Sequence, residues 1–347
     1  MNILIVTQKV DRDDPILGFF HRWIEEYATR CERVTVICLY KGNYTLPSNV
    51  EVLSLGKELG LSRVAYIKNF YTYIWKYRAR YDAVFVHMNH IYVLLGGLLW
   101  RMLKKRIVLW YVHRMVSWSL RIAERIVHVV CTSSSGAFRI ASPKVRVVGH
   151  GIDTRTFVPA EAHGSARDTL RVVTVGRISP IKHLDSMIEA IGVLIQKGVS
   201  VHLDIIGGTI GHDDVVYGRA LRALVAEHGL ESHVTFVGSL SNYVLPERLV
   251  AYDIFLSMCE TGSFDKAVLE AMSCGMLVMS PNEGFASALA PHGLVVRPQD
   301  AQDVARVLER VSTQRDQWST IGADLRNFVI KEHSLDTLID KLIKLLR

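Results

Sequence analysis

The segment Val173-Thr-Val-Gly-Arg-Ile-Ser-Pro-Ile-Lys-His-Leu-Asp185 is where the sequence first indicates its fold. An apolar run, residues 170–175, ends there at a glycine, and apolar residues then recur with helical spacing over residues 184–197. This pattern predicts a buried strand followed by a tight turn and a helix. Arg177 and Lys182 lie between the two elements, so we expect both cations at the carboxyl end of a parallel strand, where such sheets bind ligands.

The same alternation of short apolar runs and helical patterns extends over most of the chain. Strands are expected over residues 2–7, 34–40, 51–55, 83–87, 107–113, 126–132, 145–148, 170–175, 201–206, 234–237, 254–256 and 277–280. Helices are expected over residues 19–30, 61–80, 91–103, 118–124, 184–197, 219–228, 265–274, 302–312, 316–332 and 335–346. Buried strands separated by helices predict βαβ units and parallel sheets, so the expected class is α/β.

The alternation is interrupted over residues 154–169, where Pro159 and polar residues show no apolar period. We interpret this stretch as a linker, and the 347 residues of the chain suit two domains. The first domain is expected over residues 1–155 and the second over residues 165–332, with a cleft between them. A final helix, about residues 333–347, is expected to pack back on the first domain.

Composition excludes several classes of protein. A content of 49% hydrophobic and 22% charged residues provides large cores and excludes intrinsic disorder. The longest apolar run, residues 91–100, is about half as long as the roughly 20 residues that a membrane span needs. The first residues lead into a strand pattern without a basic signal region, so we expect a cytoplasmic protein. The scattered cysteines form no C-x-x-C pair, which favours reduced thiols and gives no support to a metal site.

Charge is distributed unevenly along the chain. Residues 1–155 hold 23 Lys and Arg against 11 Asp and Glu, whereas residues 156–347 hold 18 against 23. In residues 61–81 and 100–125 the cations are interleaved with tyrosine or tryptophan. Aromatic residues beside cations suit an anionic membrane surface, although a solvated helix face packed on a sheet is the alternative. No recognition motif accompanies the charge, so nucleic acid is not expected as a partner.

A second segment with chemical potential is Ser257-Met-Cys-Glu-Thr-Gly-Ser-Phe-Asp-Lys-Ala-Val-Leu-Glu-Ala-Met-Ser-Cys-Gly275. Small residues at 261–263 predict a turn into a helix, whose free N–H groups and dipole favour an anion. Asp265 is a candidate helix cap. Glu270 lies about one and a half turns into that helix, where a carboxylate can accept hydrogen bonds from a ribose diol. A capped core helix with an ion-paired Glu270 is the alternative.

Together the two segments resemble the retaining glycosyltransferases of the GT-B class called family 4. Those enzymes carry G-R-x-x-x-x-K after a strand and later E-G-F-G-x-x-x-x-E-A-M-A-C-G. Shorter matches to the family follow its order at residues 149–153, 205–208, 234–238, 251–253, 281–284 and 292–296. The resemblance implies a GT-B fold, which consists of two Rossmann-like doubly wound domains with a cleft between them. It also implies that the donor binds to the second domain and the acceptor to the first.

The resemblance implies roles for the residues of both segments. Gly176, Arg177 and Lys182 would contact the donor diphosphate, and the two cations would stabilise charge on the leaving group. Glu270 would bind the nucleotide ribose. Backbone N–H groups in the turn would contact the phosphates or the sugar, at Gly262, Ser263 and Phe264. No cofactor and no metal is expected, because cationic side chains replace the metal in this family.

The second segment departs from the family signature at two positions. Gly262 stands where the family has its first glutamate, which contacts donor-sugar hydroxyls, and Asp265 replaces a glycine. Either Glu260 or Asp265 is expected to supply the missing carboxylate. Lys266 adds a cation near the start of the helix.

Three residues of the first domain are candidates by position. His113 ends an expected strand, like the family histidine that faces the cleft near the transferred sugar, and His87 ends another. Gly18 lies in the first strand-to-helix loop, where the family has a glycine close to the donor phosphates or the acceptor. For each histidine, an ordinary surface or core position is the alternative.

We therefore expect a retaining glycosyltransferase that moves a sugar from a UDP- or GDP-linked donor to a glycan acceptor. The acceptor is expected to be lipid-linked, and the protein to lie on the inner face of the cell membrane in bacterial polysaccharide or lipopolysaccharide synthesis. The departing phosphate oxygen is expected to help to remove the acceptor proton, so no protein general base is nominated. Two alternatives are open: a nucleotide-sugar 2-epimerase of the same fold and a non-catalytic partner subunit.

Overall fold

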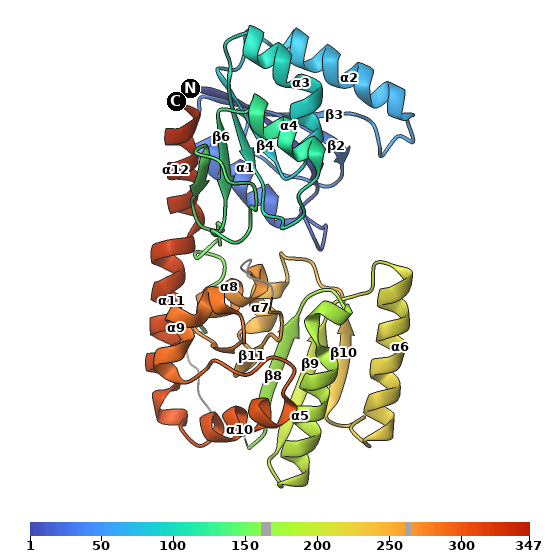
Figure 1. The fold of residues 1–347 in the computed structure, drawn as a ribbon, viewed down its shortest axis with the longest axis vertical. Helices are drawn as coiled ribbons and strands as arrows, with labels where there is room; N and C mark the ends of the chain where they lie inside the picture. Colours follow the sequence, from blue (N-terminus) through green and yellow to red (C-terminus); the bar gives the residue numbers. More distant parts are fainter. Residues whose placement is uncertain (161–167, 261–264) are drawn as a thin grey trace. The chain divides into compact units, whose positions relative to one another are not determined.

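The computed structural model of the protein describes residues 1–160, 168–260 and 265–347. The chain divides into two compact units (Figure 1). The first unit comprises residues 1–151, 241–243 and 333–347, and the second comprises residues 152–240 and 244–332. Each unit is built on one sheet whose described strands pair in parallel, so the predicted α/β class is confirmed.

The first unit contains a seven-stranded sheet with the order β3-β2-β1-β4-β5-β6-β7. Its strands are β1 (Asn2–Val10), β2 (Arg33–Lys41), β3 (Val50–Ser54), β4 (Ala83–His87), β5 (Arg106–Trp110), β6 (Val129–Thr132) and β7 (Val145–Val147). β2 pairs with β1 and β3 pairs with β2, whereas β4 pairs with the other side of β1. The strand order therefore reverses between β1 and β4.

Helices cover both faces of the first sheet. One face packs against α1 (Phe19–Arg30) and α12 (Leu335–Leu346), and the other packs against α2 (Arg63–Lys76), α3 (Ile91–Met102) and α4 (Trp118–Ile126). Successive strand residues point to opposite faces, so Ile3 lies in the core with α1 and its neighbour Leu4 lies in the core with α2. The helix α12, red in Figure 1, contributes fully buried side chains at Leu338, Ile339 and Leu342.

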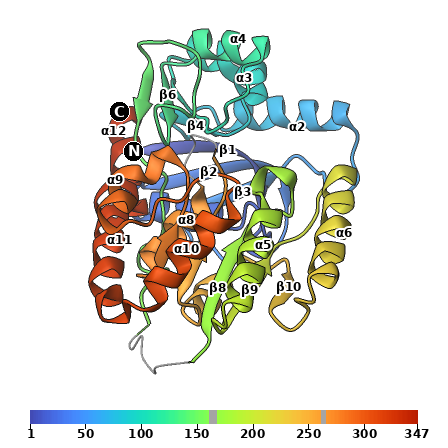
Figure 2. The ribbon, with the colours of Figure 1, turned by 60° about the horizontal axis from the view of Figure 1, so that its bottom comes forward.

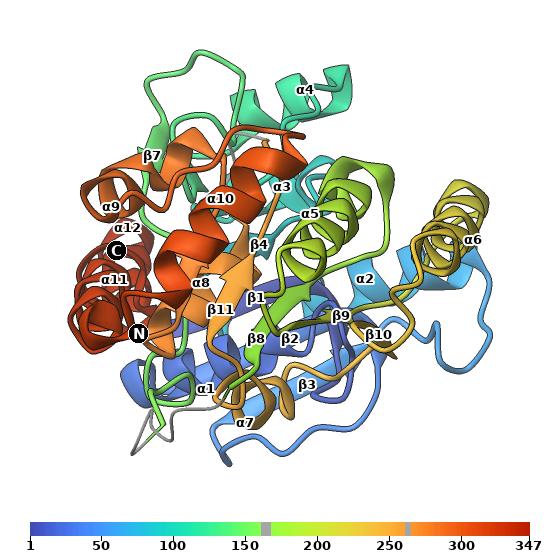
Figure 3. The same cartoon turned by 90° about the horizontal axis from the view of Figure 1, so that it is seen from below.

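The second unit contains a five-stranded sheet with the order β10-β9-β8-β11-β12. The part of this order from β10 to β11 can be followed in Figure 3. Its strands are β8 (Leu170–Val175), β9 (Val201–Ile206), β10 (Val234–Gly238), β11 (Ile254–Leu256) and β12 (Leu277–Met279). Here the strand order reverses between β8 and β11. All five strands contribute to one buried core, which extends into the helices on the sheet.

The described helices of this part of the chain include five longer ones and two short ones. They are α5 (Leu184–Gln196), α6 (His212–Glu227), α7 (Leu245–Leu249), α8 (Lys266–Ser273), α9 (Ala286–Leu289), α10 (Ala301–Ser312) and α11 (Trp318–His333). Helices α5 and α10 pack against each other (Figure 3). Among the described residues of both units, no helix combines the length and the apolar character that crossing a membrane requires.

The strand expected over residues 126–132 begins at Val129, because Ile126 still belongs to α4. Two further corrections concern candidate residues. The strand expected over residues 107–113 ends at Trp110. This residue pairs with the last residue of β4 and with Cys131 near the end of β6, so the pairing with β4 stops there. His113 therefore lies in the following loop and does not end a strand. Helix α6 begins at His212 instead of residue 219, and its first turn contains two aspartates that suit the positive end of a helix dipole.

Candidate functional site

The candidate site lies in the second unit, at the carboxyl ends of β8 and β11. Arg177 and Lys182 follow β8, whereas Glu260 and Asp265 follow β11. Nζ of Lys182 lies 2.5 Å from Oδ2 of Asp265, which joins two segments that are 83 residues apart in the sequence. Open α/β sheets bind ligands where the strand order reverses, and these residues surround that point of the second sheet.

Two glycine turns fix the backbone beneath Arg177. The amide of Gly176 donates to Ile206 O at 2.9 Å, and the amide of Ile178 donates to Gly208 O at 2.9 Å. A Cβ atom at Gly207 would lie 1.8 Å from Gly176 O, and φ of Gly207 is +156°. Only glycine therefore fits at position 207, and the loops after β8 and β9 are held tightly together.

Arg177 lies in the first of these two loops, and 48% of its side chain is exposed. Its Nε lies 3.5 Å from Oδ2 of Asp214, which is in the first turn of α6. No sequence motif surrounds Asp214, and nothing in the neighbouring sequence distinguishes it from the adjacent Asp213.

Lys182 is much less exposed, with 19% of its side chain accessible. Burial by itself lowers the pKa of Lys182, but the adjacent Asp265 carboxylate outweighs burial, so the pKa of the ammonium is raised above its ordinary value. Lys182 ends a short 3-10 turn, and the next residue, His183, adopts a left-handed conformation with φ +46° and ψ +49°. The cation is therefore held charged at a fixed point next to the start of α5.

Asp265 is the N-cap of α8 and accepts a hydrogen bond from the amide of Ala267 at 3.3 Å. The next residue, Lys266, forms an ion pair with Glu270 one turn further on, and the side chain of Glu270 is 3% exposed. Lys266 and Glu270 are thus partners across one helical turn. The predicted contacts at Gly262, Ser263 and Phe264 lie outside the described residues.

Glu260 is the more accessible of the two candidate carboxylates, with 42% of its side chain exposed against 14% for Asp265. Its Oε1 accepts a hydrogen bond from Nε2 of Gln299 at 2.9 Å and lies 3.8 Å from Nε2 of His183. Gln299 has a positive φ of 53°, as does His183 with 46°. Two residues in uncommon backbone conformations therefore flank Glu260.

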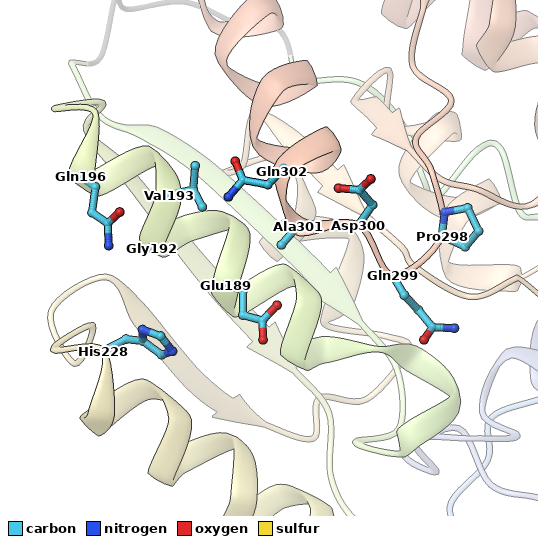
Figure 4. Close-up of a pocket in the computed structure, with 10 residues that line it drawn as sticks. All are labelled: Glu189, Gly192, Val193, Gln196, His228, Pro298, Gln299, Asp300, Ala301 and Gln302. Carbon is cyan, nitrogen blue, oxygen red and sulfur yellow. The ribbon is translucent and has the colours of Figure 1, made fainter.

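Gln299 also lines a groove of about 610 Å³ beside α5 and the start of α10 (Figure 4). The remaining lining residues are Glu189, Gly192, Val193, Gln196, His228, Pro298, Asp300, Ala301 and Gln302. None of these lining residues is a lysine or an arginine, so the groove offers no fixed cation to a diphosphate.

The candidate residues of the first unit have different surroundings. Gly18 precedes α1, and a Cβ atom there would lie 2.5 Å from Asp14 O, so the loop requires glycine for close packing. His113 is exposed, and its Nδ1 accepts from the amide of Met115 at 3.3 Å. His87 ends β4, is 1% exposed, and stacks on Phe20 with ring centroids 3.9 Å apart.

Burial lowers the pKa of His87 to about 3, so its imidazole stays neutral near pH 7. Its Nδ1 lies 3.2 Å from Oγ1 of Thr7. These surroundings make His87 a member of the core beneath the reversal point of the first sheet, whereas His113 is accessible to a ligand.

The second-unit site therefore consists of three cations, each paired with a carboxylate, next to the ends of parallel strands. The pairs are Arg177 with Asp214, Lys182 with Asp265, and Lys266 with Glu270. Such an arrangement can hold a multiply charged anion while keeping its cations in place before the anion binds. Within the part of the chain that is described, no group of three or more His, Cys, Asp or Glu side chains is arranged to hold a metal ion.

Comparison with known proteins links this site to a family. Residues 169–314 match the family model described as "Glycosyl transferases group 1". The GDP-mannose-dependent alpha-(1-6)-phosphatidylinositol monomannoside mannosyltransferase of Mycobacterium tuberculosis is 30% identical over 217 residues, covering 57% of this chain and 54% of that protein. The chain spans about half the length of the curated relatives it matches.

Solved structures match over the whole chain. HepE of Anabaena in complex with UDP has a TM-score of 0.77 at 18% identity, covering 100% of this chain and 99% of that one. Sucrose-phosphate synthase from Thermosynechococcus elongatus has a TM-score of 0.79 at 18% identity, covering 99% and 98%. At this level of identity the matches establish the shared two-domain fold.

Proposed function

We propose that this chain transfers a sugar from a nucleotide diphosphate sugar to a glycan acceptor, because residues 169–314 match the model of the group 1 glycosyl transferases and the chain has the GT-B fold. The observation that carries the proposal is the position of Arg177 and Lys182 at the reversal point of the second sheet. Two fixed cations there match the charge of a diphosphate.

In the proposed reaction Arg177 and Lys182 bind the diphosphate of a UDP- or GDP-linked donor and stabilise the charge that develops as the sugar leaves. These side chains supply the positive charge that a metal ion supplies elsewhere, so we propose that no metal is needed. Glu270 accepts hydrogen bonds from the ribose once Lys266 turns from it toward the phosphates. The sugar is transferred with retention of its anomeric configuration.

Glu260 is our choice for the carboxylate that contacts the donor sugar. Asp265 already binds Lys182 and caps α8, so both of its oxygens have partners. Glu260 is the more exposed residue, and its contacts with Gln299 and His183 both involve Oε1. The second oxygen, Oε2, is therefore the better candidate acceptor for a sugar hydroxyl.

We propose a lipid-linked acceptor on an anionic membrane surface, which the first unit binds through α2, α3 and α4. The outer sides of these helices expose apolar residues at Val64, Ile67, Tyr71, Trp75, Ile91, Leu98, Met102, Trp118 and Ile122. Exposed cations accompany them at Arg63, Lys68, Lys76, Arg78, Arg80, Arg101, Lys104, Arg121 and Arg125. Apolar and aromatic side chains together with cations are typical of surfaces that bind anionic lipid.

These three helices are neighbours, so their exposed residues form one surface, which we call the α2–α4 face. Tyr71 in α2 donates a hydrogen bond to Leu95 O in α3 at 2.9 Å, and α3 packs against α4 (Figure 2). The relative from Mycobacterium tuberculosis has a name that specifies a phosphatidylinositol monomannoside acceptor, which supports the lipid-linked class. We assign His113 and the Gly18 loop to the acceptor side and the protein to the inner face of the membrane in bacterial surface-glycan synthesis.

The decisive experiment measures thermal stabilisation by a panel of nucleoside diphosphates, with EDTA present, for wild type, Arg177→Ala and the control Arg219→Ala. Arg219 is an exposed cation on α6 and takes part in none of the ion pairs described above. One nucleotide should stabilise wild type and Arg219→Ala but not Arg177→Ala, because ligand binding raises the melting temperature. If no nucleoside diphosphate stabilises wild type, the proposal is wrong.

A second experiment distinguishes transfer from other reactions of a nucleotide sugar. With the donor that the panel identifies, anomeric coupling constants in the NMR spectrum of the product should show the configuration of the donor. Conversion of the nucleotide sugar into its C2 epimer without any acceptor would instead indicate a 2-epimerase. An inverted product would refute the retaining mechanism while leaving the transfer reaction in place.

A further inference from the structure

The geometry points to a function for Asp214: it positions the guanidinium of Arg177 for the donor diphosphate. This inference rests on the proposed function and adds a residue that neither the motifs nor the comparisons identify. In this inference Asp214 does not bind the donor itself, and its role is to hold the cation that does.

Asp214 is itself firmly held. Its side chain is 11% exposed, and its Oδ2 accepts a hydrogen bond from the amide of Ile210 at 3.2 Å. It lies in the first turn of α6, where the helix dipole favours a negative charge. Burial raises the pKa of Asp214, but hydrogen bonds from Ile210 and Ser179 and the charge of Arg177 outweigh burial, so the pKa is lowered and the carboxylate stays ionised at neutral pH.

The carboxylate and the cation come from two loops that are bonded to each other. Arg177 belongs to the loop after β8, whereas Ile210 and Asp214 belong to the loop after β9 and the helix that follows. The backbone hydrogen bond from Ile178 to Gly208 and the close approach of Gly207 to Gly176 O hold the loops at one distance. The position of the Asp214 carboxylate relative to the backbone of Arg177 is therefore fixed.

The contact also leaves the cation available to a ligand. The ion pair uses Nε of Arg177, whereas the guanidinium carries four further N–H bonds on its two terminal nitrogens. Nearly half of the side chain is exposed. A guanidinium oriented through one edge can present the other edge to two phosphate oxygens, and restricting its rotamers beforehand reduces the entropy lost on binding.

The chain offers a matched control in the adjacent residue. Asp213 lies in the same first turn of α6 and carries the same charge, but its side chain is exposed. Asp213→Asn and Asp214→Asn therefore change the net charge and the charge of the helix terminus equally. Only Asp214→Asn removes the partner of Arg177.

The experiment measures the dissociation constant of the nucleoside diphosphate that stabilises wild type most, by calorimetry, for six proteins. These are wild type, D213N, D214N, D214E, R177A and the double variant D214N/R177A. We expect D214N to weaken binding about tenfold, D213N less than twofold, and the double variant to bind like R177A, because residues that act through one contact are not additive. D214E should recover part of the lost affinity, and melting temperatures without ligand identify any general loss of folding.

Each alternative outcome has a definite meaning. If R177A weakens binding and D214N does not, or if D214N weakens binding equally in the R177A background, Asp214 does not position Arg177. If R177A binds the diphosphate as tightly as wild type, the proposed donor site itself is wrong, and the inference about Asp214 is wrong with it. A loss in D214N that D213N reproduces would indicate a charge effect and would also overturn the inference.

Discussion

Nζ of Lys182 and Oδ2 of Asp265 lie 2.5 Å apart, and both side chains are largely buried. The pair connects the segment after β8 to the N-cap of α8, across the point where the strand order of the second sheet reverses. One ion pair therefore fixes both the expected diphosphate-binding cation and the start of the helix that carries Glu270.

Replacing Asp265 by asparagine should destabilise the protein. The amide side chain can still cap α8, since asparagine is as good an N-cap as aspartate, but Lys182 becomes a buried cation without its partner. Breaking a buried pair from one side costs about 3 kcal/mol, and we expect a loss of that order in the free energy of unfolding measured with urea. The exposed Asp316→Asn is the control, and a loss below about 0.5 kcal/mol in Asp265→Asn would contradict the importance of the pair.

Gly207→Ala should disturb the contact between the loops after β8 and β9, which holds the backbone at Arg177. The new methyl group would lie 1.8 Å from Gly176 O at a φ of +156°. We expect a loss of about 1–3 kcal/mol in the free energy of unfolding together with weaker nucleotide binding. Gly211→Ala is the control, because a Cβ atom there would have nothing within 4 Å. Equal behaviour of the two variants would show that the loops adapt easily.

Glu260→Gln should weaken the binding of the donor sugar but not the binding of the diphosphate. If Glu260 contacts the donor sugar, the variant binds the nucleotide sugar about tenfold more weakly and the nucleoside diphosphate as tightly as wild type, because hydrogen bonds to charged groups are worth roughly 1.5–3 kcal/mol. Calorimetry with both ligands measures the two constants. Glu231→Gln, an exposed position elsewhere in the second unit, should change neither. Equal affinity of Glu260→Gln and wild type for the nucleotide sugar would rule this contact out.

Trp75→Ser and Trp118→Ser should weaken membrane binding. Their side chains are 53% and 74% exposed on the α2–α4 face, so their loss costs little stability but removes two apolar anchors. We expect each variant to bind anionic liposomes several-fold more weakly in flotation at low salt. Val216→Ser, an exposed apolar residue on α6, should bind like wild type. If the wild-type protein does not bind anionic liposomes, the membrane proposal is wrong.

His87 should make stability depend on pH in the acidic range. The pKa of His87 is lowered from 6.5 to about 3 by burial, so between these values the unfolded chain binds a proton that the folded protein does not. The free energy of unfolding therefore falls as pH decreases from about 6.5, by up to about 1.4 kcal/mol per pH unit. His87→Gln should reduce this slope between pH 6 and 4, whereas the exposed His113→Gln should retain it.

Most of the architecture could be predicted from the sequence because buried parallel strands are short, apolar and separated by helices. Three of the predicted strands have the predicted bounds in the structure, at residues 170–175, 201–206 and 254–256. The strand expected to reach His113 ends earlier because its neighbours stop pairing at Trp110, and a single sequence does not show where a neighbouring strand ends.

The ion-paired Glu270 was an alternative that the sequence offered, whereas the two ion pairs that join distant segments could not be predicted in the same way. The motif spacing singles out Arg177, Lys182 and Glu270, since each lies within a recognisable segment. Asp214 has no such segment around it, and its contact with Arg177 depends on how two loops are bonded. The partner of Lys182 likewise follows from the strand order, because β8 and β11 become neighbours only in the folded sheet.

The helix α12 belongs to the first unit although the entire second unit precedes it in the chain. On the ribosome, the strands of the first sheet emerge early, yet the core beside Trp23 and Tyr27 stays open to water until Leu338 and its neighbours have been synthesised. We therefore expect the second unit to acquire its native packing during translation before the first unit does. A nascent chain arrested ahead of α12 would present that uncovered apolar sheet face to chaperones.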